Sequence, residues 1–180
     1  LAAIAADGPS QRLFYSDMQA SQIGVLDLQD TTSKPTIVVE AEHSVEGMAF
    51  DYTSEDLYWT SFANSSISRV HIGKETSFPA SPSRLVRLAR TDKPRGIALD
   101  ICAMRIYWTN WGHEPSIQRA YFSGRGLETL IKGKDVSTPN ALSLDPANGF
   151  LYWADSRLDK IERADLDGRH RVVISNQPKH

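Results

Sequence analysis

The feature that most constrains the fold is a short aromatic segment that occurs four times at nearly even spacing. The copies are LFYSD, LYWTS, IYWTN and LYWAD, at residues 13–17, 57–61, 106–110 and 151–155. Their first aromatic rings, at Phe14, Tyr58, Tyr107 and Tyr152, are 44, 49 and 45 residues apart. An aspartate stands seven residues before each ring, at Asp7, Asp51, Asp100 and Asp145. Self-similarity with a period of 40 to 50 residues predicts an array of equivalent structural units.

Within each unit the hydrophobic pattern has a period of two or forms a short apolar run, which is typical of strands. The third unit shows four such segments, near residues 97–100, 106–109, 117–121 and 127–131, separated by turn-forming residues. Four antiparallel strands every 45 residues or so indicate an all-β fold, with each unit a blade of a β-propeller. The second strand of a blade packs on both faces, so we assign a wedge-filling role to its paired rings. These are Tyr58, Trp59, Tyr107, Trp108, Tyr152 and Trp153, and the small residues Ala49, Ala98 and Ala141 fit the crowded innermost strand.

These segments resemble the YWTD repeat, the class B repeat of the low-density-lipoprotein receptor family. The run IYWTNWGHEPSIQRAYFSG, followed by TPNALSLD and LYWADSRLDKIERADLDG, is most similar to a low-density-lipoprotein receptor-related protein. The resemblance implies a six-bladed YWTD propeller, of which residues 1–180 supply four consecutive four-stranded blades. We place these blades at about 1–42, 43–91, 92–136 and 137–180. An open arc leaves two sheet faces uncovered, so we expect the chain alone to be marginally stable or prone to aggregate.

The chain departs from the repeat at several positions. The final aspartate is kept at Asp17 and Asp155 but is Ser61 and Asn110 in the middle units, which puts charged pairing with Arg69 or Arg119 in doubt. Relatives often carry a second cysteine where this chain has Ala164. We therefore interpret Cys102 either as a free thiol or as a thiol whose partner lies in a part of the parent protein outside this fragment.

Composition excludes several classes of function. The 20 basic and 22 acidic residues give a net charge of −2, so neither nucleic acid nor direct membrane contact is expected. The opening residues have no basic segment and do not form a signal peptide. One cysteine and five histidines without zinc-ligand spacing predict no metal site and no cofactor in this segment. The resemblance implies calcium only in neighbouring modules of the parent protein.

Antiparallel strand order places the loops after each second and fourth strand at one end of the cylinder. A patch of exposed rings and charges at this end would be a ligand-binding face, made of His43, Phe62, Trp111, His113, Glu114, Arg157 and Asp159. The alternative for Trp111 is that its ring folds back onto its own blade. Asn64 begins an Asn-Ser-Ser glycosylation sequon at the same end. The Ser- and Pro-rich segment 73–83, at the opposite end, is interpreted as a mobile loop.

Three histidines in loops at the first end, His43, His113 and His180, could sense pH, since imidazole gains charge between neutral and endosomal pH. The alternative is that they are ordinary solvated histidines. The resemblance implies release of cargo in acidified endosomes, and our hypothesis is that these residues tune that contact.

Six-bladed propellers also serve as calcium-dependent lactonases, which makes an enzyme the rival class. Here the axial positions are Glu46, Arg95 and Asn140, and a cation beside Arg95 is electrostatically unfavourable. No catalytic motif with a supporting context occurs. The recurring Asp51, Asp100 and Asp145 are interpreted as turn formers.

The sequence therefore predicts a non-enzymatic, extracellular protein-binding or spacer module of an endocytic receptor. Family membership implies EGF-like and ligand-binding neighbours, a chaperone for the propeller in the endoplasmic reticulum, and a single-pass receptor found at the cell surface and in endosomes. A matrix propeller or a Wnt co-receptor propeller is the alternative.

Overall fold

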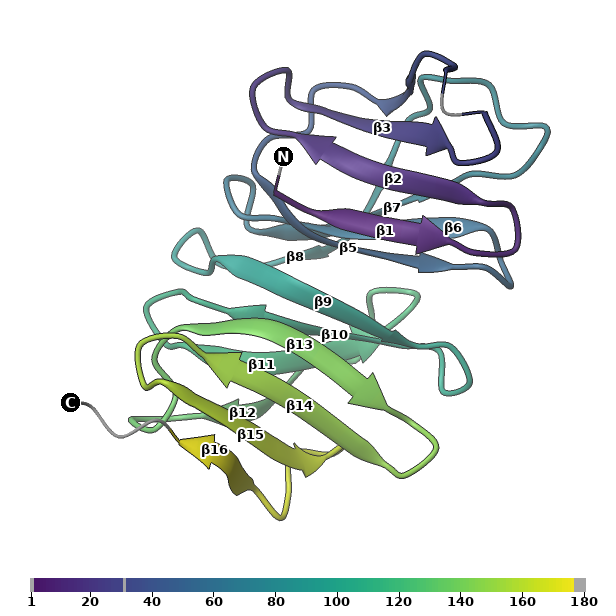
Figure 1. Ribbon diagram of the computed structural model, residues 1–180. Helices are drawn as coiled ribbons and strands as arrows, with labels where there is room; N and C mark the ends of the chain where they lie inside the picture. The colour runs from purple at the N-terminus through teal and green to yellow at the C-terminus, as the bar shows by residue number, and fades with distance from the viewer. Residues whose placement is uncertain (1, 31, 177–180) are drawn as a thin grey trace.

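The computed structural model describes residues 2–30 and 32–176, so His180 lies outside the described residues. It contains four antiparallel sheets, each of four strands in chain order (Figure 1). The sheets are formed by β1 (Ile4–Asp7), β2 (Arg12–Asp17), β3 (Gln22–Asp27) and β4 (Thr36–Val39); β5 (Val45–Asp51), β6 (Asp56–Ser61), β7 (Ser66–His71) and β8 (Ser83–Arg87); β9 (Pro94–Asp100), β10 (Arg105–Asn110), β11 (Ser116–Tyr121) and β12 (Glu128–Lys132); and β13 (Pro139–Asp145), β14 (Phe150–Asp155), β15 (Lys160–Asp165) and β16 (Val172–Asn176). The predicted four blades are confirmed.

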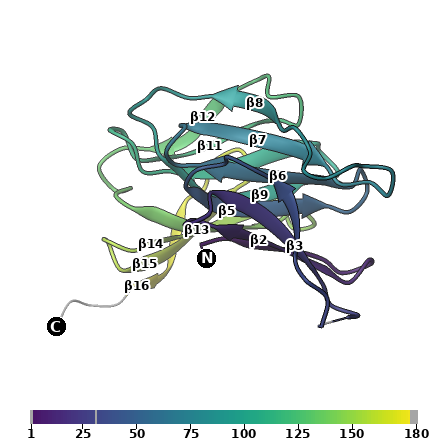
Figure 2. The same ribbon diagram turned by 90° about the horizontal axis from the view of Figure 1, so that it is seen from above.

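The sheets are arranged as an arc around their first strands. The innermost strands β1, β5, β9 and β13 are neighbours in that order, and the first and fourth sheets lie at the two ends of the fan (Figure 2). No strand pairing joins sheet to sheet in the described ranges, so contacts between sheet faces hold the arc together. None of the described residues forms a helix long and apolar enough to cross a membrane.

Paired rings on the second strand of each sheet fill the space between sheets, as predicted. The Trp side of each sheet faces the preceding sheet: Trp59 packs with Phe14 of the first sheet, and both are fully buried. The Tyr side faces the following sheet, since Tyr58 packs with Trp108 of the third sheet. Successive residues of a strand point to opposite faces, so one ring pair serves two junctions. Tyr152 has no following sheet and is only half-buried.

The third residue of the YWTD segment links each sheet to the next. The hydroxyl of Thr60 donates to the Arg95 carbonyl oxygen at 2.6 Å, and that of Thr109 donates to the Asn140 carbonyl oxygen at 3.1 Å. Both acceptors lie on the innermost strand of the following sheet. The third residue of the YWTD segment therefore fixes how far each sheet is displaced along the strands relative to the next sheet.

The closest approach of neighbouring sheets occurs at glycines of the innermost strands. A Cβ at Gly47 would lie 2.2 Å from the Arg95 carbonyl oxygen, and one at Gly96 would lie 2.4 Å from the Asn140 carbonyl oxygen. The half-buried Ala49 and Ala98, two of the three small residues that the sequence analysis selected, face the same junctions two residues further along. The third, Ala141, is exposed and lies at the strand position of Gly47 and Gly96. The absence of a side chain matters most at the glycines.

The bottom end of the arc is formed by the turns that follow the first and third strands of each sheet. Asp51 Oδ1 accepts the Thr53 amide at 2.8 Å, Asp100 Oδ1 accepts the Ala103 amide at 3.0 Å, and Asp145 Oδ1 accepts the Asn148 amide at 3.3 Å. The recurring aspartates thus lie in turns that they help to close.

The segment 73–83, interpreted as a mobile loop, is attached to the first sheet. Phe78 and Ala80 pack against the first core cluster, and the Ala80 amide donates to the Val38 carbonyl oxygen at 2.8 Å. The mobile-loop interpretation rested on the polar composition of the segment. It is wrong because two apolar side chains anchor the segment across the junction between the first and second sheets.

Candidate recognition surface at the top end

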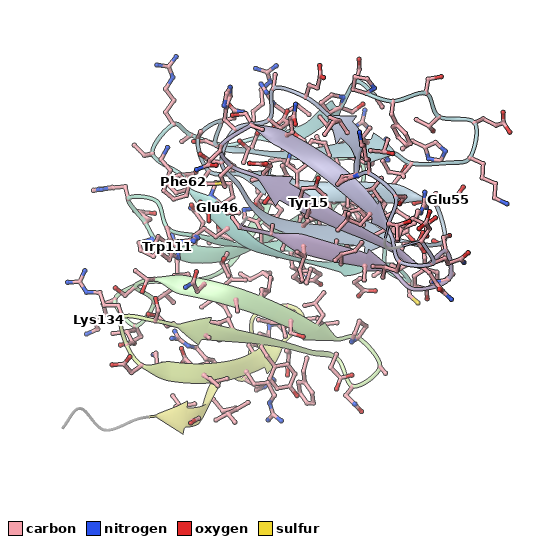
Figure 3. All side chains as sticks on the ribbon, turned by 45° about the horizontal axis from the view of Figure 1, so that its top comes forward. Tyr15, Glu46, Glu55, Phe62, Trp111 and Lys134 are labelled. Carbon is pink, nitrogen blue, oxygen red and sulfur yellow. The ribbon has the colours of Figure 1, made fainter. Side chains whose placement is uncertain are left out.

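We call the end that carries the loops after each second and fourth strand the top end. It is formed by residues 18–21, 40–44, 62–65, 88–93, 111–115, 133–138 and 156–159. Figure 3 shows Phe62, Glu46, Trp111 and Lys134 toward this end, with Glu55 at the opposite end.

An arginine clamp lies at the axial side of the top end. Arg95, on β9, pairs with Glu46 of β5 at 2.8 Å, and its guanidinium carbon lies 3.9 Å from the centroid of the Trp111 ring. The indole Nε1 of Trp111 donates to the Pro139 carbonyl oxygen at 2.8 Å. The ring therefore reaches across to the fourth sheet and does not fold back onto its own blade alone. One carboxylate, one guanidinium and one ring thus connect the second, third and fourth sheets.

A second pairing of cation and ring lies beside the clamp. Lys93 Nζ is 5.3 Å from the centroid of the Phe62 ring and 3.4 Å from the Phe62 carbonyl oxygen. Phe62 and Trp111 are each half-buried, with part of each ring open to solvent. Lys93 and Arg95 come from one segment of chain, so the two rings belong to one surface.

The other residues of the predicted patch are exposed loop residues. They are His43, His113, Glu114, Arg157 and Asp159. His43 Nδ1 lies 2.8 Å from the Ser21 hydroxyl oxygen, and the preceding Glu42 is buried, where it accepts the Trp59 indole N–H at 3.3 Å. Asn64 is exposed in the tight turn between β6 and β7.

The last residue of the YWTD segment organises the top loops. Asp155 is 1% exposed and accepts the Ser137 amide at 2.7 Å and the amides of Thr138, Arg157 and Leu158 at 3.1 to 3.2 Å. Burial by itself would raise the pKa of Asp155, but the backbone N–H groups outweigh burial and lower the pKa below that of an ordinary aspartate.

Neutral residues fill the same position in the middle sheets. Asn110 Oδ1 accepts the Lys93 amide at 2.6 Å, while the Ser61 hydroxyl donates to the His43 carbonyl oxygen at 2.8 Å. The arginines whose pairing was in doubt bind elsewhere: Arg69 pairs with Asp56 at 3.3 Å, and Arg119 pairs with Glu128 at 2.8 Å. The YWTD acid is therefore a loop cap, and charge pairing between blades does not depend on it.

A hollow of about 520 Å³ opens at the axial mouth, lined by Ala2, Glu46, Arg95, Gly96, Asn140, Ala141, Ala154 and Ser156. Its one carboxylate is paired with Arg95. Within residues 2–30 and 32–176, no group of three or more His, Cys, Asp or Glu side chains could hold a metal ion. The donor set of this hollow is suited to hydrogen bonding with a peptide and poorly suited to a bare cation.

Sequence reasoning missed two histidine and carboxylate pairs at the bottom end. His71 Nδ1 lies 3.0 Å from Asp56 Oδ1, and His170 Nδ1 lies 2.5 Å from Asp165 Oδ2. The first pair joins the paired ends of β6 and β7, and the second joins the end of β15 to the turn before β16. The register Asp56 to His71 could have indicated the first of them.

Comparison with known proteins agrees with the repeat pattern. The family model "Low-density lipoprotein receptor repeat class B" matches residues 104–146 and 149–177. Protein cueball of Drosophila grimshawi is 30% identical over 190 residues, covering 100% of this chain and 31% of that protein. The human low-density lipoprotein receptor-related protein 5-like protein is 29% identical over 149 residues, covering 81% of this chain and 55% of that protein. The chain thus spans about a third to about half of these curated relatives.

Solved structures show the same fold. A chain from a nidogen/laminin complex superposes with a TM-score of 0.85 at 23% identity, covering 97% of this chain and 64% of its own length. A gluconolactonase from Xanthomonas campestris superposes with a TM-score of 0.77 at 17% identity, covering 99% of this chain and 63% of its own. At these identities the likeness concerns architecture only. Together with the repeats, the matches show that the chain carries low-density-lipoprotein receptor class B repeats and forms four blades of a YWTD β-propeller.

Proposed function

We propose that this chain is a non-enzymatic protein-recognition and spacer module in the extracellular part of an endocytic, lipoprotein-receptor-related receptor. The observation that carries the proposal is the clamp in which Glu46 and the Trp111 ring hold the Arg95 guanidinium at the top end. Arginine and tryptophan are the residues most enriched among those that dominate binding energy at protein interfaces. A guanidinium already fixed by two partners loses little conformational freedom when a ligand binds.

The surroundings of the clamp favour protein recognition over catalysis. The hollow beside it combines backbone, amide and hydroxyl groups with a single carboxylate that is already neutralised. A hydrolase of the calcium type needs several free oxygen donors around the metal, and the Arg95 charge opposes a cation there.

The same surface would serve a matrix or signalling propeller, a class that shares this architecture, as the nidogen superposition illustrates. The proposal of an endocytic receptor is supported by the class B repeats and by the similarity to the human low-density lipoprotein receptor-related protein 5-like protein. Under it, the partners are protein ligands and neighbouring EGF-like or ligand-binding modules, with a propeller chaperone during folding. The chain would occupy the cell surface and endosomes as part of a single-pass receptor.

The test is a binding screen with the intact protein against purified secreted and matrix proteins, laminin among them. We expect at least one saturable interaction that weakens tenfold or more in Arg95→Gln and Trp111→Ala. Tyr52→Ala, which removes an exposed ring at the bottom end, is the matched control and should leave binding unchanged. If no interaction were weakened by substitution of Arg95 or Trp111, the recognition role of the clamp would be rejected and only the spacer role would remain.

The endosomal part of the proposal rests on the top-end histidines. Protonation of His43 and His113 would add positive charge near the ligand, and His180 was selected with them from the sequence. His113 shares a hollow with Glu114, Lys132 and Lys134, so its charge would act on those groups first. Replacing all three histidines with Gln should flatten the binding curve between pH 7.4 and 5.5. An unchanged curve would reject the role.

A further inference from the structure

A second hollow lies at the top end beside β12, the outermost strand of the third sheet, and shares no lining residue with the arginine clamp. It measures about 400 Å³ and lies between the loop after β10 and the loop after β12, both from the third sheet. Its lining residues are His113, Glu114, Pro115, Lys132, Gly133, Lys134 and Val136. We call it the rim groove.

The walls of the rim groove are held by the fourth sheet on one side and by the segment that leads into β9 on the other. The Asp135 carbonyl oxygen accepts Arg171 at 2.7 Å and Lys160 Nζ at 2.9 Å, which ties the loop after β12 to the fourth sheet. On the other side, the His113 amide donates to the Thr91 carbonyl oxygen at 3.3 Å. A groove fixed at both walls presents its side chains without a large cost in loop ordering.

The floor of the groove is apolar. Val136 is 4% exposed and belongs to the core cluster shared by the third and fourth sheets, and Pro115 beside it is half-buried. An apolar side chain of a ligand would therefore extend the existing core.

The rim of the groove carries two lysines that the fold does not use for charge pairing. Lys132 and Lys134 are exposed, and no carboxylate of the described ranges lies within 4 Å of either ammonium group. The adjacent cations of the fourth sheet are different, since Lys160 and Arg171 both pair with the buried Glu162, at 3.1 and 2.7 Å. Glu114 is the single acid of the lining and makes no ion pair with the lysines.

From this arrangement we infer that the rim groove binds an acidic peptide segment whose apolar side chain enters between Pro115 and Val136 and whose carboxylates lie against Lys132 and Lys134. The inference rests on the proposed function and names the chemistry of one partner. Glu114 repels carboxylates from the opposite wall, so the charges of the ligand have one favourable orientation. A basic segment would meet two like charges at the same place.

The test uses a fluorescein-labelled peptide in which one leucine is flanked on each side by two glutamates. Fluorescence polarisation with the intact protein should show saturable binding. The double variant Lys132→Glu and Lys134→Glu turns two attractions into repulsions, which should weaken binding about tenfold or more. Lys74→Glu, a reversal of an exposed lysine at the bottom end, is the matched control and should change affinity little.

Two altered probes separate the groove from simple charge attraction. Replacing the leucine with serine should weaken binding about tenfold, and replacing the glutamates with glutamines should abolish the effect of the lysine reversal. Equal binding of the leucine and serine probes, or equal binding to the wild type and the reversed variant, would overturn the inference. Near-ultraviolet circular dichroism of the reversed variant checks that the fold is intact.

The experiments distinguish failure of the rim-groove proposal from failure of the proposal that the arginine clamp binds proteins. Arg95→Gln should leave binding of the labelled peptide unchanged, because the clamp lies at the axial side and the groove at the rim. Peptide binding that depends on the lysines would support the groove even if the screen of extracellular proteins found nothing. Peptide binding lost equally in Arg95→Gln and in the lysine reversal would overturn the groove as a separate site.

Discussion

The indole N–H of Trp111 donates to the carbonyl oxygen of Pro139 at 2.8 Å, although the two residues belong to different sheets. Because the ring also stacks on Arg95, one side chain both shapes the recognition surface and stabilises the junction of the third and fourth sheets. Binding and stability are therefore coupled at this residue.

Trp111→Phe keeps a ring for Arg95 but removes the donor to Pro139. We expect the free energy of unfolding of the intact protein to fall by about 0.5–1.5 kcal/mol, as for loss of one hydrogen bond. Trp111→Ala also removes the packing of a half-buried ring and should cost about 2–4 kcal/mol. Urea unfolding measures both, with Tyr52→Ala as the control. Equal stability of the Phe and Ala variants would show that the ring does not bridge the sheets.

The second prediction concerns the close approach of the inner strands. Gly47→Ala and Gly96→Ala each place a methyl group against a backbone carbonyl of the next sheet, at 2.2 and 2.4 Å. A backbone atom cannot rotate away, so we expect each change to cost about 2 kcal/mol or more. Gly8→Ala meets no atom within 4 Å and is the matched control. Thermal unfolding that is unchanged in Gly96→Ala would contradict the packing described.

These two predictions show what the sequence could and could not reveal. The four aromatic segments were enough for blade number and strand order, because their spacing repeats and each ring pair must be buried on both faces. The roles of Gly47, Gly96 and Thr60 depend on the stagger between sheets, which no single unit encodes. The rim groove could not be found in advance, since Pro115 and Val136 are brought together by two loops of irregular backbone. Trp111 was selected from the sequence as a ring at the top end, where it lies half-buried, but its acceptor is 28 residues away and could not be foreseen.

The third prediction follows from the lowered pKa of Asp155. A carboxylate whose pKa is lower in the folded state stabilises the protein above its unfolded pKa of about 3.9, and this stabilisation is lost as pH falls through the folded value. Asp155→Asn should therefore be less stable than the wild type by about 1–3 kcal/mol at pH 7, with a difference that shrinks below about pH 4.

The matched exchange is Asn110→Asp at the equivalent position of the third sheet. Asn110 Nδ2 donates to Asp92 Oδ1 at 3.0 Å, so an aspartate there would face a like charge. Because of that repulsion, this variant should be less stable than the wild type at pH 7, and the deficit should shrink in acid, as for Asp155→Asn but from a repulsion gained rather than from a cap lost. Urea titrations at pH 3, 5 and 7 measure both deficits, and a deficit of Asp155→Asn that stays the same from pH 7 to pH 3 would exclude the capping role of the Asp155 carboxylate.

The fourth prediction concerns the two uncovered sheet faces. Ile4 is 63% exposed on the face of the first sheet, Ile161 is 46% exposed on the face of the fourth, and both lie in strands. We expect the 180-residue polypeptide in isolation to associate, and Ile4→Lys with Ile161→Lys to weaken that association. Sedimentation velocity measures it. Met104→Lys, at an exposed turn position away from both faces, is the control. A monomer with a sharp unfolding transition would show that the open faces are tolerated.

The last prediction is that Asn64 carries an N-linked glycan when the chain passes through the secretory pathway. Asn64 is exposed, while the Ser66 hydroxyl that completes the sequon is buried without a hydrogen-bond partner among the described residues. The fold therefore gives no reason for a hydroxyl at position 66, whereas the corresponding Ser116 accepts Asn110 Nδ2 at 3.5 Å. The enzyme that attaches the glycan must reach the Ser66 hydroxyl. Because this hydroxyl is buried in the fold, the glycan has to be attached before β7 folds.

Ser66→Ala should abolish the glycan and leave the free energy of unfolding unchanged or slightly raised, since it removes a buried polar group that pairs with nothing. Ser65→Gly keeps the sequon, suits the positive φ of 49° at that position, and should remain glycosylated. Intact mass before and after enzymatic deglycosylation measures the modification. A glycan at Asn64 would cover the Phe62 side of the top end and leave Trp111 and the rim groove open, so ligands would approach over the third and fourth sheets. An unmodified Asn64 in protein secreted from a eukaryotic cell would remove that constraint and return Phe62 to the recognition surface.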